Sequence, residues 1–208
     1  MIYPTSQGHY EIEIEKSKFI STLYQIKTTS QTKAILKELA KEHPQARHIV
    51  YAYTLGYNGE LLGKTDDGEP AGTAGGPTLN ILKSNNCTGA LIATVRYFGG
   101  IKLGTGGLSR AYSLSALGAF ENSTFAEIEE LSLLKIKLPY NLYDSFLSAI
   151  NKIEANAFQK QEELFSDMVD LAYSFPSKLA PQLEKFILDL GKGSLNFSIE
   201  KIPGLFDL

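Results

Sequence analysis

Residues 89–112 read GALIATVRYFGGIKLGTGGLSRAY, and this stretch decides how the first part of the chain folds. It begins with a nearly continuous apolar run over residues 89–98, which is typical of a strand buried on both faces. Five glycines follow over residues 99–107, and they predict a loop. Residues 108–121 then predict a helix that packs closely. The stretch therefore predicts a central strand that passes through a glycine-rich turn into a buried helix.

The sequence before this stretch alternates strand and helix signals. Apolar side chains alternate with glutamate near the start, which predicts a half-buried strand. Ser30 is suited to cap a following helix, and Asn58-Gly59 predicts a tight turn. The predicted strands cover residues 10–15, 19–27 and 49–55, and the predicted helices cover residues 31–42 and 77–83.

The tail, from residue 133 onward, shows a different pattern of predicted elements. Their order is β-α-β-β-α-β, which is typical of ferredoxin-like domains. Its predicted elements are strands at 134–138, 157–164, 169–175 and 195–199, and helices at 140–153 and 176–190. We therefore expect an α+β fold with a domain boundary near Ser132. The first domain then covers residues 1–132, and the ferredoxin-like domain covers residues 133–208.

Composition narrows the possible partners. The net charge of −3 gives no global attraction toward nucleic acid or an anionic membrane. The three arginines, Arg47, Arg96 and Arg110, all lie before the tail, so the tail is a poor candidate for binding a phosphate backbone. We find no apolar run that could span a bilayer and no secretory signal. With the single Cys87 unable to form an internal disulfide, we expect a cytoplasmic protein without a membrane partner.

The glycine-rich segment at residues 98–107 has the parts of an anion site. A buried strand ends in glycines that expose backbone N–H groups, and a helix start adds positive potential. Arg96, Lys102 and Arg110 cluster around it. We therefore expect sulfate or phosphate to bind at residues 104–110. The alternative is that the glycines only permit a tight crossover, and the segment is not a Walker loop.

The acidic loop within residues 65–77 contains Asp66, Asp67 and Glu69. Three interpretations stay open: the carboxylates cap backbone N–H groups of a solvated turn, bind Mg²⁺, or contact the basic segment. No histidine pair has zinc spacing, and no serine or cysteine lies in a nucleophile elbow. The sequence thus predicts no catalytic residue, no metal site and no cofactor.

Four motifs together resemble the Impact family, in its bacterial YigZ branch. They begin at Lys16, Tyr51, Asp66 and Val95 and read KSKFI, YAYTLG, DDGEPAGTAG and VRYFGGIKLGTGGLSRAY. The resemblance implies a two-layer α/β sandwich of the ribosomal-protein and GHMP-kinase type for the first domain. It also implies a tail similar to the last domain of elongation factor G.

The resemblance also implies a role in translation, because eukaryotic relatives regulate translation. It further implies which residues form the binding surface. We favour a translation- or ribosome-related protein whose loops contact RNA phosphates or a protein partner. A phosphate-handling enzyme with a metal on the acidic loop, and a pure interaction scaffold, stay open. The residues of the family motifs expected to form the binding surface are Asp66, Asp67, Glu69, Thr73, Arg96, Tyr97, Gly99, Gly100, Lys102, Gly104, Gly106, Gly107 and Arg110.

Overall fold

The computed structural model describes residues 1–202, which form two units of mixed helix and strand. The first unit is Met1–Ile128, and the second begins at Glu129. This confirms the expected α+β class. The last residues of the expected second domain, 203–208, lie outside the described part of the chain.

The first unit is built on an antiparallel sheet in which β6 is central, as its apolar run predicts. Every residue from 90 to 96 is buried, because this strand has a neighbour on both edges and helices on both faces. The strands follow one another across the sheet in the order β2 (Gly8–Ile14), β3 (Ser17–Gln25), β6 (Ala90–Tyr97), β4 (His48–Leu55) and β5 (Leu61–Thr65).

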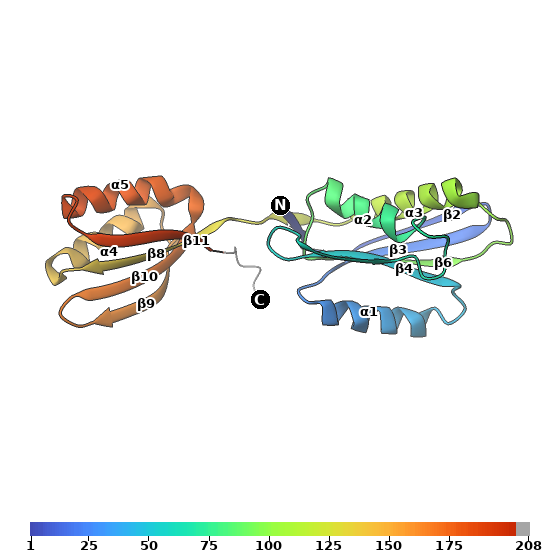
Figure 1. Cartoon of the computed structure of the whole chain (residues 1–208), viewed down its shortest axis with the longest axis horizontal. Helices are drawn as coiled ribbons and strands as arrows, with labels where there is room; N and C mark the ends of the chain where they lie inside the picture. The colour runs from blue at the N-terminus through green and yellow to red at the C-terminus, as the bar shows by residue number, and fades with distance from the viewer. Residues whose placement is uncertain (203–208) are drawn as a thin grey trace. The chain divides into compact units, whose positions relative to one another are not determined.

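Helices cover the two faces of this sheet (Figure 1). α2 (Gly75–Ser84) and α3 (Gly104–Glu121) lie on one face, and α1 (Thr29–Glu42) lies on the other. Tyr112 of α3 packs with Phe19, whereas Leu39 of α1 packs against the opposite side of β6. The expected two-layer packing describes the side of α2 and α3, and α1 adds a further layer.

α3 begins at Gly104 instead of the expected residue 108. Gly104 has φ +70°, a left-handed conformation that glycine adopts without steric cost. Gly106 and Gly107 therefore lie in the first helical turn, not in a loop. The N–H groups of a first turn have no acceptor within the helix, so this difference leaves the start of α3 available to an anion.

Three short strands are not predicted by local sequence patterns. β5 is an edge strand with mostly exposed side chains, so it lacks the alternation that marks a half-buried strand. β1 (Ile2–Pro4) and β7 (Phe125–Glu127) pair with each other as a separate ribbon. Each has three residues, which is too few for a periodic signal.

The second unit has the predicted β-α-β-β-α-β order, and its strands pair antiparallel in the order β11-β8-β10-β9. β8 begins earlier than expected, because Leu131 already pairs with Pro176. Among residues 1–202, no helix is both long and apolar enough to cross a bilayer. The elements are β8 (Leu131–Leu138), α4 (Tyr140–Ile153), β9 (Gln159–Phe165), β10 (Val169–Pro176), the short 3₁₀ helix η1 (Ser177–Leu179), α5 (Ala180–Gly191) and β11 (Asn196–Ile202).

We expect residues 129–208 to fold when they are expressed alone. The unit encloses its own core, in which Leu134, Phe146 and Leu183 are fully buried. Starting at residue 129 keeps the whole of β8, which a start at 133 would shorten. Circular dichroism should report mixed helix and strand with a cooperative thermal transition. A random-coil spectrum would show that this unit depends on the first one.

Candidate functional site

A pocket of about 390 Å³ lies where the acidic loop and the glycine-rich segment meet. The acidic loop contributes residues 68–70, and the glycine-rich segment contributes Phe98 and residues 102–105. Arg47 and His48, at the beginning of β4, form another wall. Its volume is at the lower end of the range for small-molecule sites. The two loops that the sequence singles out therefore line one cavity.

A buried ion pair forms the inner wall of the pocket. Arg96 Nη1 donates to Glu69 Oε1 at 2.5 Å, and Arg96 Nη2 donates to Ser17 Oγ at 3.2 Å. The Tyr112 hydroxyl also donates to Glu69 Oε1, at 2.8 Å. Arg96 is 4% exposed and Glu69 is 9% exposed. Because a buried charge requires a partner, this pair fixes the acidic loop to the central strand.

Strand pairing positions Arg96 from both sides. Phe19 of β3 and His48 of β4 lie opposite Arg96 across the sheet, so the three side chains share a face. The Arg96 guanidinium lies 5.3 Å from the centre of the Phe19 ring and 5.6 Å from that of Phe98. Burial raises the pKa of the Tyr112 phenol well above its ordinary value, and the negative charge of Glu69 adds to this. Tyr112 therefore stays a neutral hydrogen-bond donor at physiological pH.

The other two carboxylates of the acidic loop bind backbone. Asp66 Oδ1 accepts from the N–H groups of Ala74 and Gly75 at 2.9 and 2.8 Å, and its Oδ2 accepts from Gly72 at 2.8 Å. Asp67 Oδ2 accepts from the N–H of Ile49 at 2.6 Å. Neither residue lines the pocket. Their carboxylates hold the loop and the start of α2 in place, as the capping interpretation describes.

Replacing Asp66 by asparagine is expected to cost about 1–2 kcal/mol at pH 7, the scale of a lost helix cap. Asparagine would present an NH₂ group to one of the donors. Burial raises the pKa of Asp66, but the backbone N–H groups of Gly72, Gly75 and Ala74 outweigh it, and the net pKa lies below 3.8. The stabilisation is complete above pH 3.8 and is lost as the pH falls through the lower pKa of the folded state.

Urea unfolding at several pH values between about 7 and 2 tests this pH dependence. The difference between wild type and Asp66→Asn should shrink only in the acidic part of that range. Glu121→Gln, an equal change of charge at an exposed position of α3, is the matched control and should change stability little. A constant difference at every pH would contradict the role given to the Asp66 charge.

The remaining predicted residues separate into those that support the fold and those that face solvent. Thr73 donates to the carbonyl of Pro70, and Tyr97 points to the α1 side, where its hydroxyl lies 2.8 Å from His43 Nδ1. Arg110 is exposed on α3. Of the predicted binding residues, the pocket is lined by Glu69, Arg96, Lys102 and Gly104, and not by Asp66, Asp67, Thr73, Tyr97, Gly99, Gly100, Gly106, Gly107 or Arg110.

The mouth of the pocket includes residues that are not in the list of predicted binding residues. Arg47 lies over the Phe98 ring, with its guanidinium carbon 5.8 Å from the ring centre. Phe98 is 41% exposed although it is a large aromatic residue. Arg47, as one of only three arginines, offered a weak signal, whereas Phe98 was hidden within an apolar run. The mouth thus combines an exposed aromatic ring with the cations Arg47 and Lys102.

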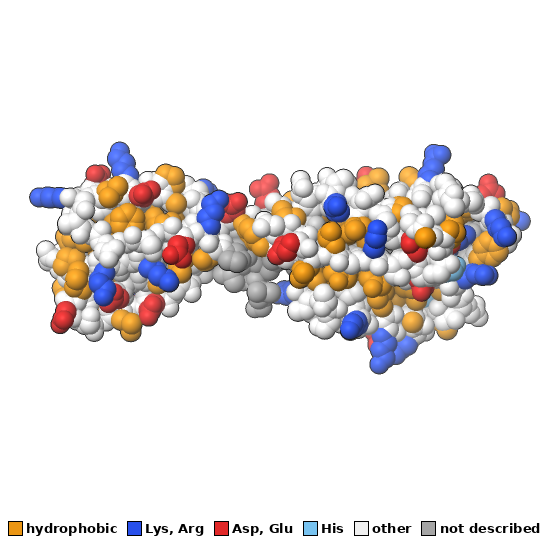
Figure 2. All heavy atoms as spheres, in the orientation of Figure 1, with side chains coloured by type: hydrophobic (Ala, Val, Ile, Leu, Met, Phe, Trp, Pro, Cys, Tyr) orange, Lys and Arg blue, Asp and Glu red, His pale blue; other side chains and the backbone are white. Residues whose placement is uncertain are grey.

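The start of α3 opens into this mouth. Gly104 and Thr105 line the pocket, and no side chain caps this end of the helix. Uncapped N–H groups and the helix dipole favour an anion here. On the faces shown in Figure 2, by contrast, charged side chains are scattered over both units instead of forming a broad basic patch.

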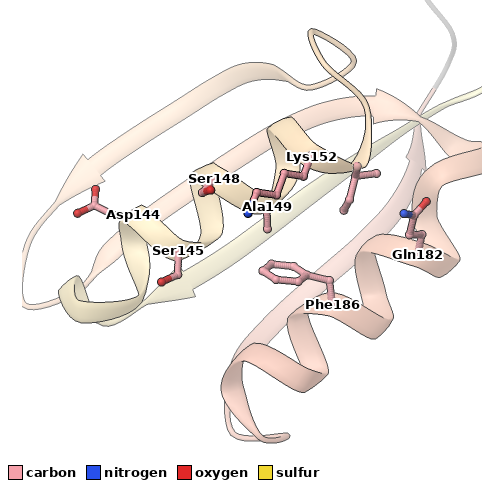
Figure 3. A pocket seen from close by; sticks show the side chains of 8 residues that line it. Asp144, Ser145, Ser148, Ala149, Lys152, Gln182 and Phe186 are labelled. Atoms are coloured by element: carbon pink, nitrogen blue, oxygen red, sulfur yellow. The ribbon is translucent and has the colours of Figure 1, made fainter.

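A larger hollow of about 670 Å³ lies in the second unit, between α4 and α5 (Figure 3). Phe186 of α5 points toward α4, and polar residues such as Asp144, Ser148 and Gln182 also line the hollow. None of the residues that line this hollow is buried. It is an open surface groove without converging polar groups, so the pocket in the first unit is the better candidate site.

Comparisons with known proteins agree over most of the chain. Residues 15–120 match the Impact N-terminal domain. The IMPACT family member YvyE of Bacillus subtilis is 32% identical, over 89% of this chain and 84% of that protein. The family member YigZ of Escherichia coli is 31% identical, over 88% and 89%. A crystal structure of a protein described as hypothetical has a TM-score of 0.64 at 29% identity, over 94% and 95%. The similarity thus extends over both units.

Proposed function

Because this chain belongs to the Impact family, we propose that it is a translation-related binding protein whose pocket holds one nucleotide of a single-stranded RNA. The phosphate would lie at the start of α3, beside Lys102 and Arg47. The base would stack on Phe98. The role in translation follows from the resemblance to family members that regulate this process.

One observation carries the proposal: an exposed aromatic ring, two cations and an uncapped helix start share a single pocket mouth. Proteins that bind single strands combine positive charge along the backbone path with aromatic rings on which bases stack. A purely ionic site would not need the Phe98 ring at the mouth. A net charge of −3 is compatible with this role, because a pocket for one nucleotide needs only local positive charge.

The engagement of the acidic loop argues against the enzymatic alternative. Both carboxylate oxygens of Asp66 and the Oδ2 of Asp67 accept hydrogen bonds from backbone N–H groups. Glu69 Oε1 is paired with Arg96. A cation bound by Asp66, by Asp67 Oδ2 or by Glu69 Oε1 would have to displace these donors. We therefore favour binding over metal-assisted phosphate chemistry.

Fluorescence anisotropy with a labelled single-stranded RNA of about eight nucleotides tests the proposal. At about 50 mM salt, the variant Arg47→Ala/Lys102→Ala should bind at least about tenfold more weakly than wild type. Loss of the one phosphate that both cations contact should also lower the dependence of log K on log salt by about 0.7. Both residues are exposed, so the variant should keep its fold.

Arg110→Ala is the control, because Arg110 is an exposed cation of α3 outside the pocket. It should change affinity by less than about twofold, the scale of screened surface charge. An equal loss in the control and the pocket variant would indicate diffuse attraction and would contradict the proposal. Absence of RNA binding by wild type would do the same and would favour a protein partner.

A further inference from the structure

The innermost polar group of the pocket has an unused acceptor. The Arg96 guanidinium, the Tyr112 hydroxyl and His48 Nε2 all approach Glu69 Oε1, the last at 3.8 Å. No residue among 1–202 donates a hydrogen bond to Glu69 Oε2. Among residues 1–202, the buried side-chain oxygen and nitrogen atoms that lack a hydrogen-bond partner are Thr32 Oγ1 and Arg96 Nε. Glu69 Oε2 also lacks a partner in this range but is not among these buried atoms. Glu69 Oε2 is therefore open to the pocket, although the residue as a whole is nine-tenths buried.

His48 lies at the same end of the pocket. Its Nδ1 lies 2.6 Å from the carbonyl oxygen of Asp67. A carbonyl can only accept, so Nδ1 carries a proton and donates it to this oxygen. The inner end of the pocket thus presents the free carboxylate oxygen Glu69 Oε2. A phosphate would be repelled there, whereas a hydroxyl group would donate.

The two ends of the pocket are therefore suited to different chemical groups of a ligand. The mouth offers Lys102, Arg47 and the start of α3 to an anion, and the inner end offers Glu69 Oε2 to a neutral donor. A ribonucleotide carries a phosphate and a hydroxyl donor on one sugar, and its 2′-hydroxyl is the group that distinguishes RNA from DNA.

We propose that Glu69 Oε2 accepts a hydrogen bond from the ribose 2′-hydroxyl, so that the pocket selects a ribonucleotide over a deoxyribonucleotide. This inference rests on the proposed function, because it assigns the sugar of the nucleotide held at the same site. A deoxyribose would leave a nearly buried carboxylate oxygen without a donor. Sites built to hydrogen-bond a hydroxyl reject analogues that lack it, because their polar groups are then left unpaired.

The test uses the wild-type chain and changes the ligand, because substitution of Glu69 would unpair Arg96 and endanger the fold. Anisotropy compares oligomers of one sequence as RNA, DNA and 2′-fluoro RNA. The 2′-fluoro form keeps an RNA-like sugar pucker but has no donor. RNA should bind at least about tenfold more tightly than both others, the scale of a hydrogen bond to a charged group.

The outcomes separate this inference from the proposed function. Equal binding of RNA, DNA and 2′-fluoro RNA would overturn the hydroxyl contact and leave the nucleotide site standing. Binding of 2′-fluoro RNA as tight as that of RNA, with weak DNA binding, would assign selectivity to sugar pucker and also overturn it. No binding of any oligomer would overturn the proposed function, and it would overturn the hydroxyl contact too unless a free ribonucleotide binds more tightly than its deoxy form.

A further arm identifies the source of the ribonucleotide. Titration with a ribonucleoside 5′-monophosphate, its 2′-deoxy form and inorganic phosphate is followed at the amides of Gly104 and Thr105. If the free ribonucleotide binds as tightly as the oligomer and the deoxy form does not, the sugar contact holds and the RNA proposal fails. Equal shifts from all three probes would show phosphate binding alone and overturn the sugar contact.

Discussion

Replacing Arg96 by methionine is expected to lower the free energy of unfolding of the first unit by about 3–5 kcal/mol. Methionine fills much of the same space, so the main effect is on charge. Glu69 would keep the Tyr112 hydroxyl as a donor but would lose the cation that neutralises it in a nearly closed site. Most of the expected cost is the penalty of an uncompensated buried charge.

A double variant separates this penalty from lost packing. Adding Glu69→Gln to Arg96→Met removes the unpaired charge and leaves an amide oxygen for Tyr112. Chemical denaturation of wild type, both single variants and the double variant gives the coupling energy. The double variant should be more stable than Arg96→Met alone. If it is less stable, the ion pair is not the interaction that holds the acidic loop.

Replacing Gly99 by alanine is expected to destabilise the first unit by about 3 kcal/mol, as severe overpacking does. A Cβ at this position would overlap the backbone carbonyl of Lys16 in the turn between β2 and β3. Backbone atoms cannot rotate away as the end of a side chain can. The Gly99 N–H also donates to Ser17 Oγ, which in turn accepts from Arg96, so the displacement would reach the pocket.

Gly106→Ala is the matched control on the other side of the same segment. A Cβ there meets nothing within 4 Å, and the backbone needs no positive φ. Alanine is the better helix former, so the control should be neutral or up to about 1 kcal/mol more stable. Thermal unfolding of both variants measures the change in stability at each glycine. Equal loss of stability would mean that the glycines act together as a flexible loop instead of meeting separate local requirements.

Local patterns predict the elements whose burial repeats along the chain. The apolar run of β6 and the order of the second unit are of this kind, because a strand or helix buried on a regular face leaves a regular sequence signal. β5 and the start of α3 are missed for physical reasons. β5 lies at an exposed edge, and the conformation of Gly104 depends on what surrounds the turn.

The pocket itself depends on contacts between distant segments. His48 lies beside Arg96 only because β4 pairs with β6 in one particular register, and no local pattern specifies that register. Arg110 illustrates the opposite error. It follows the glycines closely in sequence, but each helical residue turns about 100° from the last, and this rotation places Arg110 outside the pocket.

The position of β6 has a consequence for the order in which the first unit assembles. β6 lies at the centre of the sheet, yet it is the last of the five strands to be synthesised. Until residue 97 has emerged, β2 with β3 and β4 with β5 can exist only as two separate hairpins. Each hairpin then has an unpaired strand edge that can pair with strands of other chains. Isolated hairpins are marginally stable, so the first unit is expected to collapse late during translation, in a single step when β6 joins the two halves.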